Sequence, residues 1–312
     1  MNISVIVCTF NRAESMRITL ASLTDQVFDP KRFEIVVVDN HSTDETRNVV
    51  LQSQQASPVA IQYLYEAQQG KSYALNAGIH AAKGRILAFT DDDVTVDKHW
   101  LFQIDEAFQG SSVDAVGGRV VPLLPFEKPR WFHDKFMAVI GGCDRGDKPH
   151  LLQAPRGLLH GANFSIRAGI VHKLGGFRTD LGSARLLRSE DTEMCLRLLQ
   201  HGYSVLYHPD VVVFHRVIVT RLTKRYVRHW WFTQGMALAR MEQVKVRDGR
   251  TFFNVPLWRY RAAITNFRRY IYHSLFKREP NERFYYETRF WVFVGFLYET
   301  LVLQRENRDV KS

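Results

Sequence analysis

A short apolar run that leads into three aspartates is the feature that most constrains how this chain folds. Ile86–Phe89 is followed closely by Asp91, Asp92 and Asp93, here called the aspartate triplet. The run predicts a strand buried on both faces. Three adjacent carboxylates repel one another unless cations or donors compensate them, and their oxygens suit a hard ion such as Mg²⁺ or Mn²⁺. The pattern therefore predicts a metal and diphosphate site at a strand end. The alternative is a solvated acidic turn that caps a helix beginning near Lys98.

Strands and helices alternate through the first part of the chain. Three further apolar runs predict strands at Ile3–Cys8, Glu34–Asn40 and Ala60–Tyr65, and a helical pattern opens at Gly70–Gly78. This alternation predicts an α/β fold with a Rossmann-like, mostly parallel sheet flanked by helices, and a site at the carboxyl ends of the strands. The loop after the first strand has neither a GxGxxG nor a GxxxxGK pattern, so no dinucleotide fingerprint or P-loop is indicated.

Polar residues follow the first two strands and should meet at one edge of the sheet. The first strand leads into Thr9, Phe10, Asn11 and Arg12, and the second ends in Asp39. An acid at the end of a second parallel strand can accept a hydrogen bond from a ribose hydroxyl or a base N–H, although such an acid is as often a cap. Together with the aspartate triplet, these residues predict one binding rim.

Two features later in the chain have both a structural and a functional interpretation. Glu190 and Asp191 open a helical pattern, and Val211–His215 predicts a strand that ends in a histidine. Acidic residues in a first turn are ordinary partners of the helix dipole. A histidine at a strand end is commonly a hydrogen-bonded surface residue. The functional alternative is that His215 completes a metal site begun by Asp93.

The segment from Pro122 to Pro155 predicts an irregular region on the acceptor side of the site. It is rich in Pro and Gly, and long irregular segments in compact domains are usually functional or mobile. His133 and His150 are candidate ligands there, with a surface location as the commoner alternative.

The order of these motifs resembles the family 2 nucleotide-sugar glycosyltransferases of GT-A fold. The resemblance covers residues 1–217 and implies an inverting enzyme that transfers a sugar from a nucleoside diphosphate donor to an acceptor hydroxyl, usually with a divalent metal. The segments that carry it, besides those already named, are Gly70–Gly78, Gly161–Ile166, Leu174–Phe177, Ser189–Asp191 and Tyr207–Asp210.

The resemblance also implies roles for individual residues. Asp93, with Asp91 and His215, would bind Mn²⁺ or Mg²⁺. Asp191, beside Glu190, would act as the general base. A UDP-sugar is the expected donor. The residues expected to bind it are Thr9, Phe10, Asn11, Arg12, Asp39, Lys71, Asn76, Asp91, Asp92 and Asn163.

The formal charge of +10 is concentrated in the last third of the chain. Residues 216–312 contain 20 Lys/Arg and 8 Asp/Glu, a net of +12, while residues 1–215 contain 22 and 24, a net of −2. Aromatic residues alternate with these cations, as in Arg225–Phe232. We therefore expect a basic, aromatic-rich helical extension over residues 218–312. It suits peripheral contact with an anionic membrane and hence a lipid-linked or other glycan acceptor. The alternative is that these helices pack against the core.

Cysteine usage and the start of the chain bear on location. Cys8, Cys143 and Cys195 are widely spaced and odd in number, which favours a reducing compartment over a disulfide framework. The first residues lack the basic leader and long apolar run of a signal peptide. These features predict a cytoplasmic protein, peripheral at the cytoplasmic face of a membrane. The oligomeric state is not predicted.

Two other classes of protein fit parts of the sequence. A sugar nucleotidyltransferase shares the nucleotide-binding design but should carry a glycine-rich loop after its first strand. A non-enzymatic nucleic-acid-binding or membrane-binding protein would account for the basic extension. Nucleic acid is disfavoured, because the basic residues of such a protein should be spread along a recognisable binding fold, whereas residues 1–215 are slightly acidic.

Overall fold

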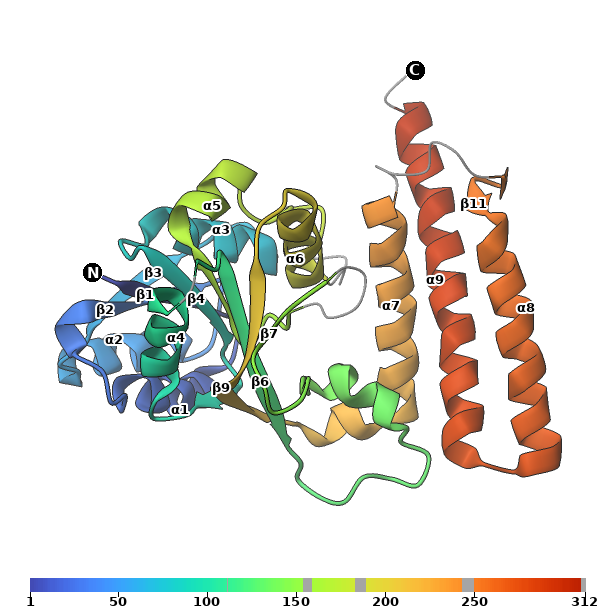
Figure 1. Cartoon of the computed structure of the whole chain (residues 1–312), viewed down its shortest axis with the longest axis horizontal. Helices are drawn as coiled ribbons and strands as arrows, with labels where there is room; N and C mark the ends of the chain where they lie inside the picture. Colours follow the sequence, from blue (N-terminus) through green and yellow to red (C-terminus); the bar gives the residue numbers. More distant parts are fainter. Residues whose placement is uncertain (111, 154–158, 183–188, 243–249, 310–312) are drawn as a thin grey trace. The chain divides into compact units, whose positions relative to one another are not determined.

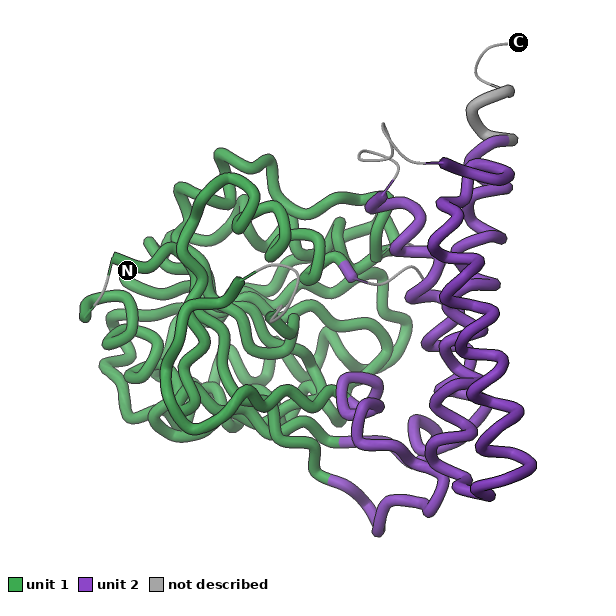
Figure 2. Tube along the Cα trace, turned by 45° about the vertical axis from the view of Figure 1, so that its right-hand side comes forward, with its two compact units in different colours: residues 1–123, 141–184, 190–216 green, residues 124–140, 185–189, 217–312 purple. Residues whose placement is uncertain are grey.

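The computed structural model describes residues 1–110, 112–153, 159–182, 189–242 and 250–309, with only the backbone described for residues 305–309. The chain divides into two compact units (Figure 2). The domain boundary expected at residue 217 stays a prediction. Unit 1 consists of Met1–Leu123, Gly141–Ala184 and Glu190–Arg216, and unit 2 of Leu124–Ile140, Arg185–Ser189 and Val217–Ser312.

Unit 1 is an α/β structure built on one large sheet (Figure 1). The four apolar runs form strands that pair in parallel in the order β3-β2-β1-β4. Every residue of β2 is buried, as expected of a strand covered on both faces. The bounds are β1 (Ile3–Thr9), β2 (Phe33–Asp39), β3 (Ala60–Tyr65) and β4 (Ile86–Asp91).

Helices cover both faces of this sheet. One apolar cluster joins Val5 to Met16 and Trp100, and a second joins Ile6 to Met194. Because successive residues of a strand point to opposite faces, Val5 and Ile6 belong to different layers of the core. The helices of unit 1 are α1 (Ala13–Thr24), α2 (Thr46–Ala56), α3 (Lys71–Ala81), α4 (Trp100–Gln109), α5 (Ala168–Leu174) and α6 (Glu190–Gln200), with a short 3₁₀ turn, Pro30–Arg32, before β2.

The second half of the sheet mixes directions. β8 runs antiparallel between β4 and β6, whereas β9 runs parallel to β6. β5 and β7 pair antiparallel with β9. It follows that β1–β4, β6 and β9 share one direction, so the expected mostly parallel sheet is confirmed. The bounds are β5 (Val94–Val96), β6 (Ala115–Leu123), β7 (His150–Leu151), β8 (Phe164–Arg167) and β9 (Val205–Arg216).

The aspartate triplet lies between two strands and not at the start of a helix. Asp91 is the last residue of β4, Asp92 and Asp93 form a turn, and β5 follows at once. Helix α4 begins later, with His99 as its N-cap residue. Asp97, and not the triplet, accepts from the N–H of His99 at the start of this helix. Asp92 and Asp93 are buried, so the alternative of a solvated acidic turn is wrong for them.

Unit 2 is mainly helical. Its long helices are α7 (Lys224–Glu242), α8 (Leu257–Tyr272) and α9 (Pro280–Asp309). A Cβ atom at Gly295 would lie 1.9 Å from the carbonyl oxygen of Phe232, so α7 and α9 cross at a glycine contact. None of the described helices combines the length and apolarity needed to span a bilayer. The shorter elements are 3₁₀ turns at Asp134–Ile140 and Val219–Leu222, a π-helical turn at His273–Lys277, and the strands β10 (Thr251–Phe252) and β11 (Val255–Pro256).

Candidate active site

The carboxyl ends of the parallel strands bring the predicted rim together. The register pairs Thr9 with Asp39 and Cys8 with Asp91. The last residues of β1, β2 and β4 are therefore neighbours at one edge of the sheet. Tyr65, the last residue of β3, pairs with Asp39 and extends this edge.

Asp39 is fixed on both of its carboxylate oxygens. Its Oδ1 accepts a hydrogen bond from the Ser42 N–H at 2.8 Å, and its Oδ2 accepts one from the Tyr63 hydroxyl at 2.8 Å. Burial raises the pKa of Tyr63 to about 12, and the hydrogen bond to Asp39 adds to this effect. Tyr63 therefore keeps its proton and holds Asp39 in place.

The loop after β1 is tied to the loop after β2. The N–H of Asn11 donates to Ser42 Oγ at 2.9 Å, and Asn11 Oδ1 accepts from the Thr43 N–H at 2.7 Å. Asn11 has a φ of 51°, a left-handed conformation that Asn tolerates better than most residues. Phe10, by contrast, exposes its ring. The two loops thus form one wall of the site, with Phe10 on the solvent side.

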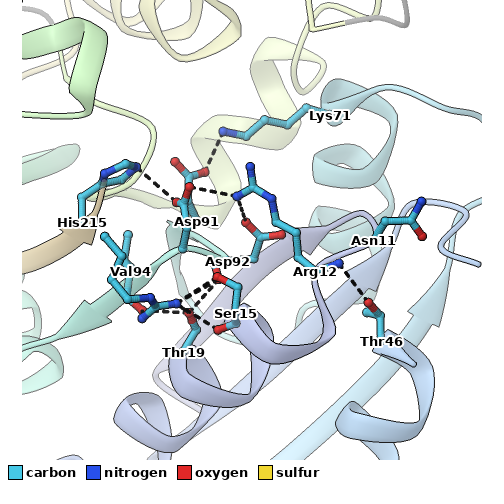
Figure 3. Close-up of polar contacts among 12 residues, drawn as sticks. Asn11, Arg12, Ser15, Thr19, Thr46, Lys71, Asp91, Asp92, Val94 and His215 are labelled. Atoms are coloured by element: carbon cyan, nitrogen blue, oxygen red, sulfur yellow. Dashed lines mark hydrogen bonds and ion pairs between the residues drawn. The ribbon is translucent and has the colours of Figure 1, made fainter. Parts of the chain in front are cut away.

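Arg12 is paired with the aspartate triplet. Its Nη1 donates to Asp92 Oδ1 at 2.8 Å (Figure 3). The same Nη1 donates to Asp93 Oδ2 at 2.9 Å. Burial would lower the pKa of Arg12, but the two carboxylates outweigh burial and raise it. Burial raises the pKa of Asp92 to about 6, and Arg12 opposes this only in part. One guanidinium therefore compensates two of the three adjacent acids.

His215 reaches the same turn from β9. Its Nε2 lies 3.2 Å from Asp93 Oδ1, and its side chain is buried. The antiparallel pairing of β5 with β9, which sets Val94 opposite His215, brings the histidine to the turn. Gly141 has a φ of +80°, and a Cβ there would lie 2.9 Å from the imidazole ring. A larger residue at Gly141 would displace His215.

Two of the three residues predicted to bind metal, Asp93 and His215, lie in contact with each other. Among the described residues, no group of three or more His, Cys, Asp or Glu side chains is arranged to hold a metal ion. Asp93 Oδ1 and His215 Nε2, both of a type that could bind a metal, nevertheless converge. Mg²⁺ is commonly held by one or two carboxylates together with substrate phosphates and water. Carboxylate and imidazole also suit Mn²⁺. The pair therefore fits an ion that takes its other ligands from a diphosphate.

Lys71 joins the triplet to the start of α6. Its Nζ lies 2.7 Å from Asp91 Oδ1 and 3.3 Å from Glu190 Oε1. Burial would lower the pKa of Lys71, but Asp91 and Glu190 outweigh burial and hold it well above its ordinary value. Burial raises the pKa of Glu190, and Lys71 opposes this only in part. Burial would likewise raise the pKa of Asp91, yet Lys71 keeps it below its ordinary value.

Asp191 is oriented by two backbone donors. Its Oδ2 accepts from the Gly161 N–H at 2.7 Å, and its Oδ1 accepts from the Thr192 N–H at 2.6 Å. The first turn of α6 also places the carboxylate at the positive end of the helix dipole. A carboxylate has about four lone-pair sites, so these two contacts leave capacity for an incoming hydroxyl.

His160 is a neighbour of this site that the sequence analysis did not single out. Burial lowers its pKa, while the charges of Asp191 and Asp91 act in the opposite direction. The imidazole is therefore close enough to both carboxylates to feel their charge. Its position directly before the Gly161–Ile166 motif was the available signal.

Asn76 and Asn163 use their amides inside the protein. Asn76 bonds both backbone polar groups of Phe177, at 2.8 and 2.9 Å. Asn163 is buried, accepts from Trp100 Nε1 at 2.9 Å and donates to the carbonyl oxygen of Val211 at 2.7 Å. Both side chains hold backbone around the site, and a contact with the donor stays a prediction for them.

The two histidines of the irregular segment lie elsewhere. His133 belongs to unit 2, where its Nε2 lies 3.0 Å from Glu282 Oε1. His150 is an exposed residue of β7, with its ring against that of Tyr207. His150 is therefore a surface residue, the commoner interpretation given above, whereas the side chain of His133 is only 12% exposed and is paired with Glu282.

Comparison with known proteins settles the family. Residues 4–175 match the sequence model of the family described as glycosyl transferase family 2. The chain belongs to this family. The resemblance noted in the motifs is thereby confirmed, and the protein is a glycosyltransferase. The alternatives of a sugar nucleotidyltransferase and of a non-enzymatic binding protein are wrong.

Several curated relatives are similar to this family 2 glycosyltransferase over most of its length. Glucosyl-dolichyl phosphate glucuronosyltransferase of Haloferax volcanii is 27% identical over 241 residues, which is 75% of each chain. Succinoglycan biosynthesis protein ExoM of Rhizobium meliloti is 26% identical over 265 residues, or 82% of this chain and 80% of that protein.

Solved structures share the fold of this glycosyltransferase. The mannosyltransferase PcManGT from Pyrobaculum calidifontis, in complex with GDP-Man and Mn²⁺, has a TM-score of 0.65 and 20% identity, covering 96% of this chain and 86% of its own. S. aureus TarS 1-349 in complex with UDP-GlcNAc has a TM-score of 0.55 and 16% identity, covering 93% and 90%. These likenesses confirm the GT-A fold with a helical C-terminal region.

Proposed function

We propose that this glycosyltransferase transfers a sugar from a nucleoside diphosphate donor to an acceptor hydroxyl with inversion at the anomeric carbon. The observation that carries the proposal is the geometry of Asp191. Two backbone N–H groups fix its carboxylate. Lys71 Nζ, 2.7 Å from Asp91 Oδ1 and 3.3 Å from Glu190 Oε1, links the aspartate triplet to the residue beside Asp191. A base that can act beside a diphosphate-binding edge is what a single displacement needs.

The nucleoside would bind at the wall formed by the loops after β1 and β2. Asp39 is the acceptor for a ribose hydroxyl or a base N–H, and Tyr63 keeps its carboxylate oriented. Asn11 ties the two loops together, while the exposed ring of Phe10 is available for stacking on the base. We expect a UDP-sugar, although related folds are known with GDP-Man as well as UDP-GlcNAc.

The diphosphate would lie along the aspartate triplet. Asp93 and His215 are the residues that would hold Mn²⁺ or Mg²⁺. Asp91 lies in the same triplet and forms an ion pair with Lys71. When bound, the ion neutralises the charge that develops on the leaving diphosphate. Lys71 supplies a second, fixed positive charge, because its pKa keeps it protonated. Electrostatic stabilisation of this kind is usually the largest contribution to lowering a barrier.

The acceptor hydroxyl would approach from the side of α6. Asp191 takes its proton as the new glycosidic bond forms and the bond to the diphosphate breaks, so a single inverting displacement completes the transfer. Glu190 is the second candidate for the base, since it neighbours Asp191 and burial raises its pKa. Its ion pair with Lys71 favours a role in holding the diphosphate side instead.

We infer a lipid-linked or other glycan acceptor and a cytoplasmic location. Two relatives support this acceptor class by their names: one is a glucosyl-dolichyl phosphate glucuronosyltransferase and the other a succinoglycan biosynthesis protein. Widely spaced cysteines that form no disulfide among the described residues are consistent with a reducing compartment.

The test uses the full chain, a panel of UDP- and GDP-sugars, and Mn²⁺ or EDTA. We expect release of nucleoside diphosphate from one donor class, dependent on the metal, and a transferred sugar whose anomeric configuration by ¹H NMR is opposite to that of the donor. Retention of configuration would refute the single displacement. Equal rates in EDTA would remove the metal from the mechanism.

A further inference from the structure

The outer face of α8 and the turn after it carries an apolar stripe that the protein does not bury. Ile264, Phe267, Ile271 and Leu275 follow one another at intervals of three, four and four residues, which places them on one side of a helix. Their exposed fractions are 61%, 54%, 37% and 63%, and the neighbouring Phe276 is 73% exposed. These five residues are called the α8 stripe. Large apolar side chains gathered in this way on a surface commonly mark an interaction site.

Several other aromatic residues of the basic extension pack within unit 2. Phe284 and Phe296 of α9 are buried, and Phe284 packs with residues of α7 and of the 3₁₀ turn at Asp134–Ile140. A different face of α8 packs within unit 2: Arg259 and Ala263, four residues apart, are both buried. Part of α7 and of α9 therefore packs inside unit 2. α9 exposes Phe290, Tyr298 and Leu301 at 42–52%, whereas the side chains of the α8 stripe (on the orange helix of Figure 1) reach 73%.

The stripe is bordered by positive charge. Residues 257–278 contain six Lys or Arg and no Asp or Glu. Arg259 is used internally, paired with Glu242. The other five are exposed. Arg261 and Arg268 are seven residues apart, so they lie along one line beside the stripe, and no acidic side chain of the described residues pairs with them. The other exposed cations are Arg269, Lys277 and Arg278.

We propose that α8 and its following turn bind the surface of an anionic lipid bilayer, with the α8 stripe in the acyl boundary and the cations at the headgroups. An apolar face joined to a basic border is the signature of a helix that lies in the plane of the interface. No described helix is suited to spanning, so attachment is peripheral. The inference does not depend on the donor chemistry proposed above.

The basic border decides between this occupant and two others. A second copy of the chain docked through the α8 stripe would bring Arg261 and Arg268 against the same residues of its partner, and like charges oppose such contact. A polynucleotide would use the cations but would gain little from burying five aliphatic and aromatic side chains, because its affinity comes mainly from phosphate contacts. An anionic bilayer can bind both parts of this surface, because its acyl region accepts the apolar side chains and its headgroups pair with the arginines and the lysine.

The test is co-sedimentation of the full chain with vesicles of phosphatidylcholine alone and of phosphatidylcholine with 30% phosphatidylserine. We expect binding to the anionic vesicles that falls as salt is raised, since screening weakens the headgroup contacts. Each basic residue near the surface contributes about fivefold in affinity. Arg261→Glu with Arg268→Glu should therefore reduce binding by at least about 25-fold. The matched control is Lys31→Glu with Lys83→Glu, which makes the same charge change at exposed sites of unit 1 and should bind like the unaltered chain.

The contribution of the α8 stripe is tested with a second pair of substitutions. Ile264→Ser with Ile271→Ser should weaken binding to anionic vesicles at every salt concentration while leaving thermal unfolding and metal-dependent donor hydrolysis unchanged. If Lys31→Glu with Lys83→Glu weakens binding to anionic vesicles as much as Arg261→Glu with Arg268→Glu does, net charge alone drives the attraction. That result would overturn the assignment to α8. A full chain that stays in the supernatant with both vesicle types would overturn the proposal altogether. If light scattering then shows a dimer that dissociates in the serine variant, the stripe is an interface between copies.

Discussion

Replacing Asp191 by asparagine tests the proposed base without changing the size of the side chain. The carboxylate accepts from two backbone N–H groups, those of Gly161 and Thr192. A carboxamide has one oxygen, so it can keep one of these bonds and must turn its NH₂ toward the other donor. A hydrogen bond to a charged group contributes about 1.5–3 kcal/mol. We therefore expect Asp191→Asn to lower the free energy of unfolding by roughly that amount and to leave the fold intact.

The effect on catalysis should be much larger than the effect on stability. Losing a general base typically costs about 10²–10⁴ in rate, whereas the wall built on Asp39 and Asn11 is unaltered. The rate of transfer at saturating donor should fall by that factor, while the affinity for a nucleoside diphosphate with Mn²⁺, measured by calorimetry, changes little.

The matched control is Asp210→Asn, the same chemical change at an exposed residue, and its transfer rate should equal that of the unaltered chain. If Asp191→Asn transfers within about threefold of this control, Asp191 is not the base, and Glu190→Gln becomes the variant to measure. If donor affinity collapses together with the rate, the residue holds the donor site together and the argument from its two backbone bonds is wrong.

Three further predictions concern the ion site, the nucleoside wall and the core of unit 2. Asp93→Ala should abolish the Mn²⁺-dependent part of nucleoside diphosphate binding in calorimetry, and unaltered titrations would refute its role. Tyr63→Phe removes the hydroxyl that holds Asp39 and should raise the donor KM by up to about tenfold with kcat unchanged; a fall in kcat alone would contradict this. Arg240→Met leaves the buried Glu299 carboxylate without the guanidinium 2.5 Å away and should cost about 3–5 kcal/mol of unfolding free energy in denaturant titration, whereas replacing both residues by Met should cost less.

Much of unit 1 could be predicted because its signals are local. The apolar runs of β1 to β4 and the helical patterns between them predict that strands alternate with helices, and such alternation predicts a parallel sheet. β8 was missed because Phe164–Arg167 has four residues, too few for a clear pattern. Only Val211–His215 of β9 was predicted, because Pro209 interrupts the apolar pattern of the full strand, Val205–Arg216. The structure accommodates Pro209 at a bulge, where the register of β6 on β9 shifts between Gly118 and Arg119.

The partners of the site residues were harder to predict than the residues themselves. Asp39 was singled out by its place at the end of β2, but Tyr63 was not, although the signal was present. In the parallel register of β2 and β3, Tyr63 lies opposite Val37. Val37 precedes Asp39 by two residues, so the side chains of Tyr63 and Asp39 are on the same face of the sheet. A long aromatic side chain can span that diagonal. Predicting the contact requires knowing which strands pair, which the sequence of either strand does not state.

The charge balance of the site leads to one last prediction, on the order of binding. The aspartate triplet, Glu190 and Asp191 supply five carboxylates. Three permanent cations face them. Lys71 is 20 residues from its partner Asp91, and Arg12 is 80 and 81 residues from Asp92 and Asp93. Arg216, the third, donates to the carbonyl oxygen of Asp92. The balance exists only once the sheet has formed, which is why a sequence pattern shows the acids without their partners. Even then the site keeps an excess of negative charge. A diphosphate, itself an anion, should therefore bind weakly until a divalent ion has entered beside Asp93. Calorimetry of UDP and GDP in EDTA and in Mn²⁺ measures this directly, and equal affinity in the two conditions would show that the permanent cations of the site suffice to hold the diphosphate without an ion.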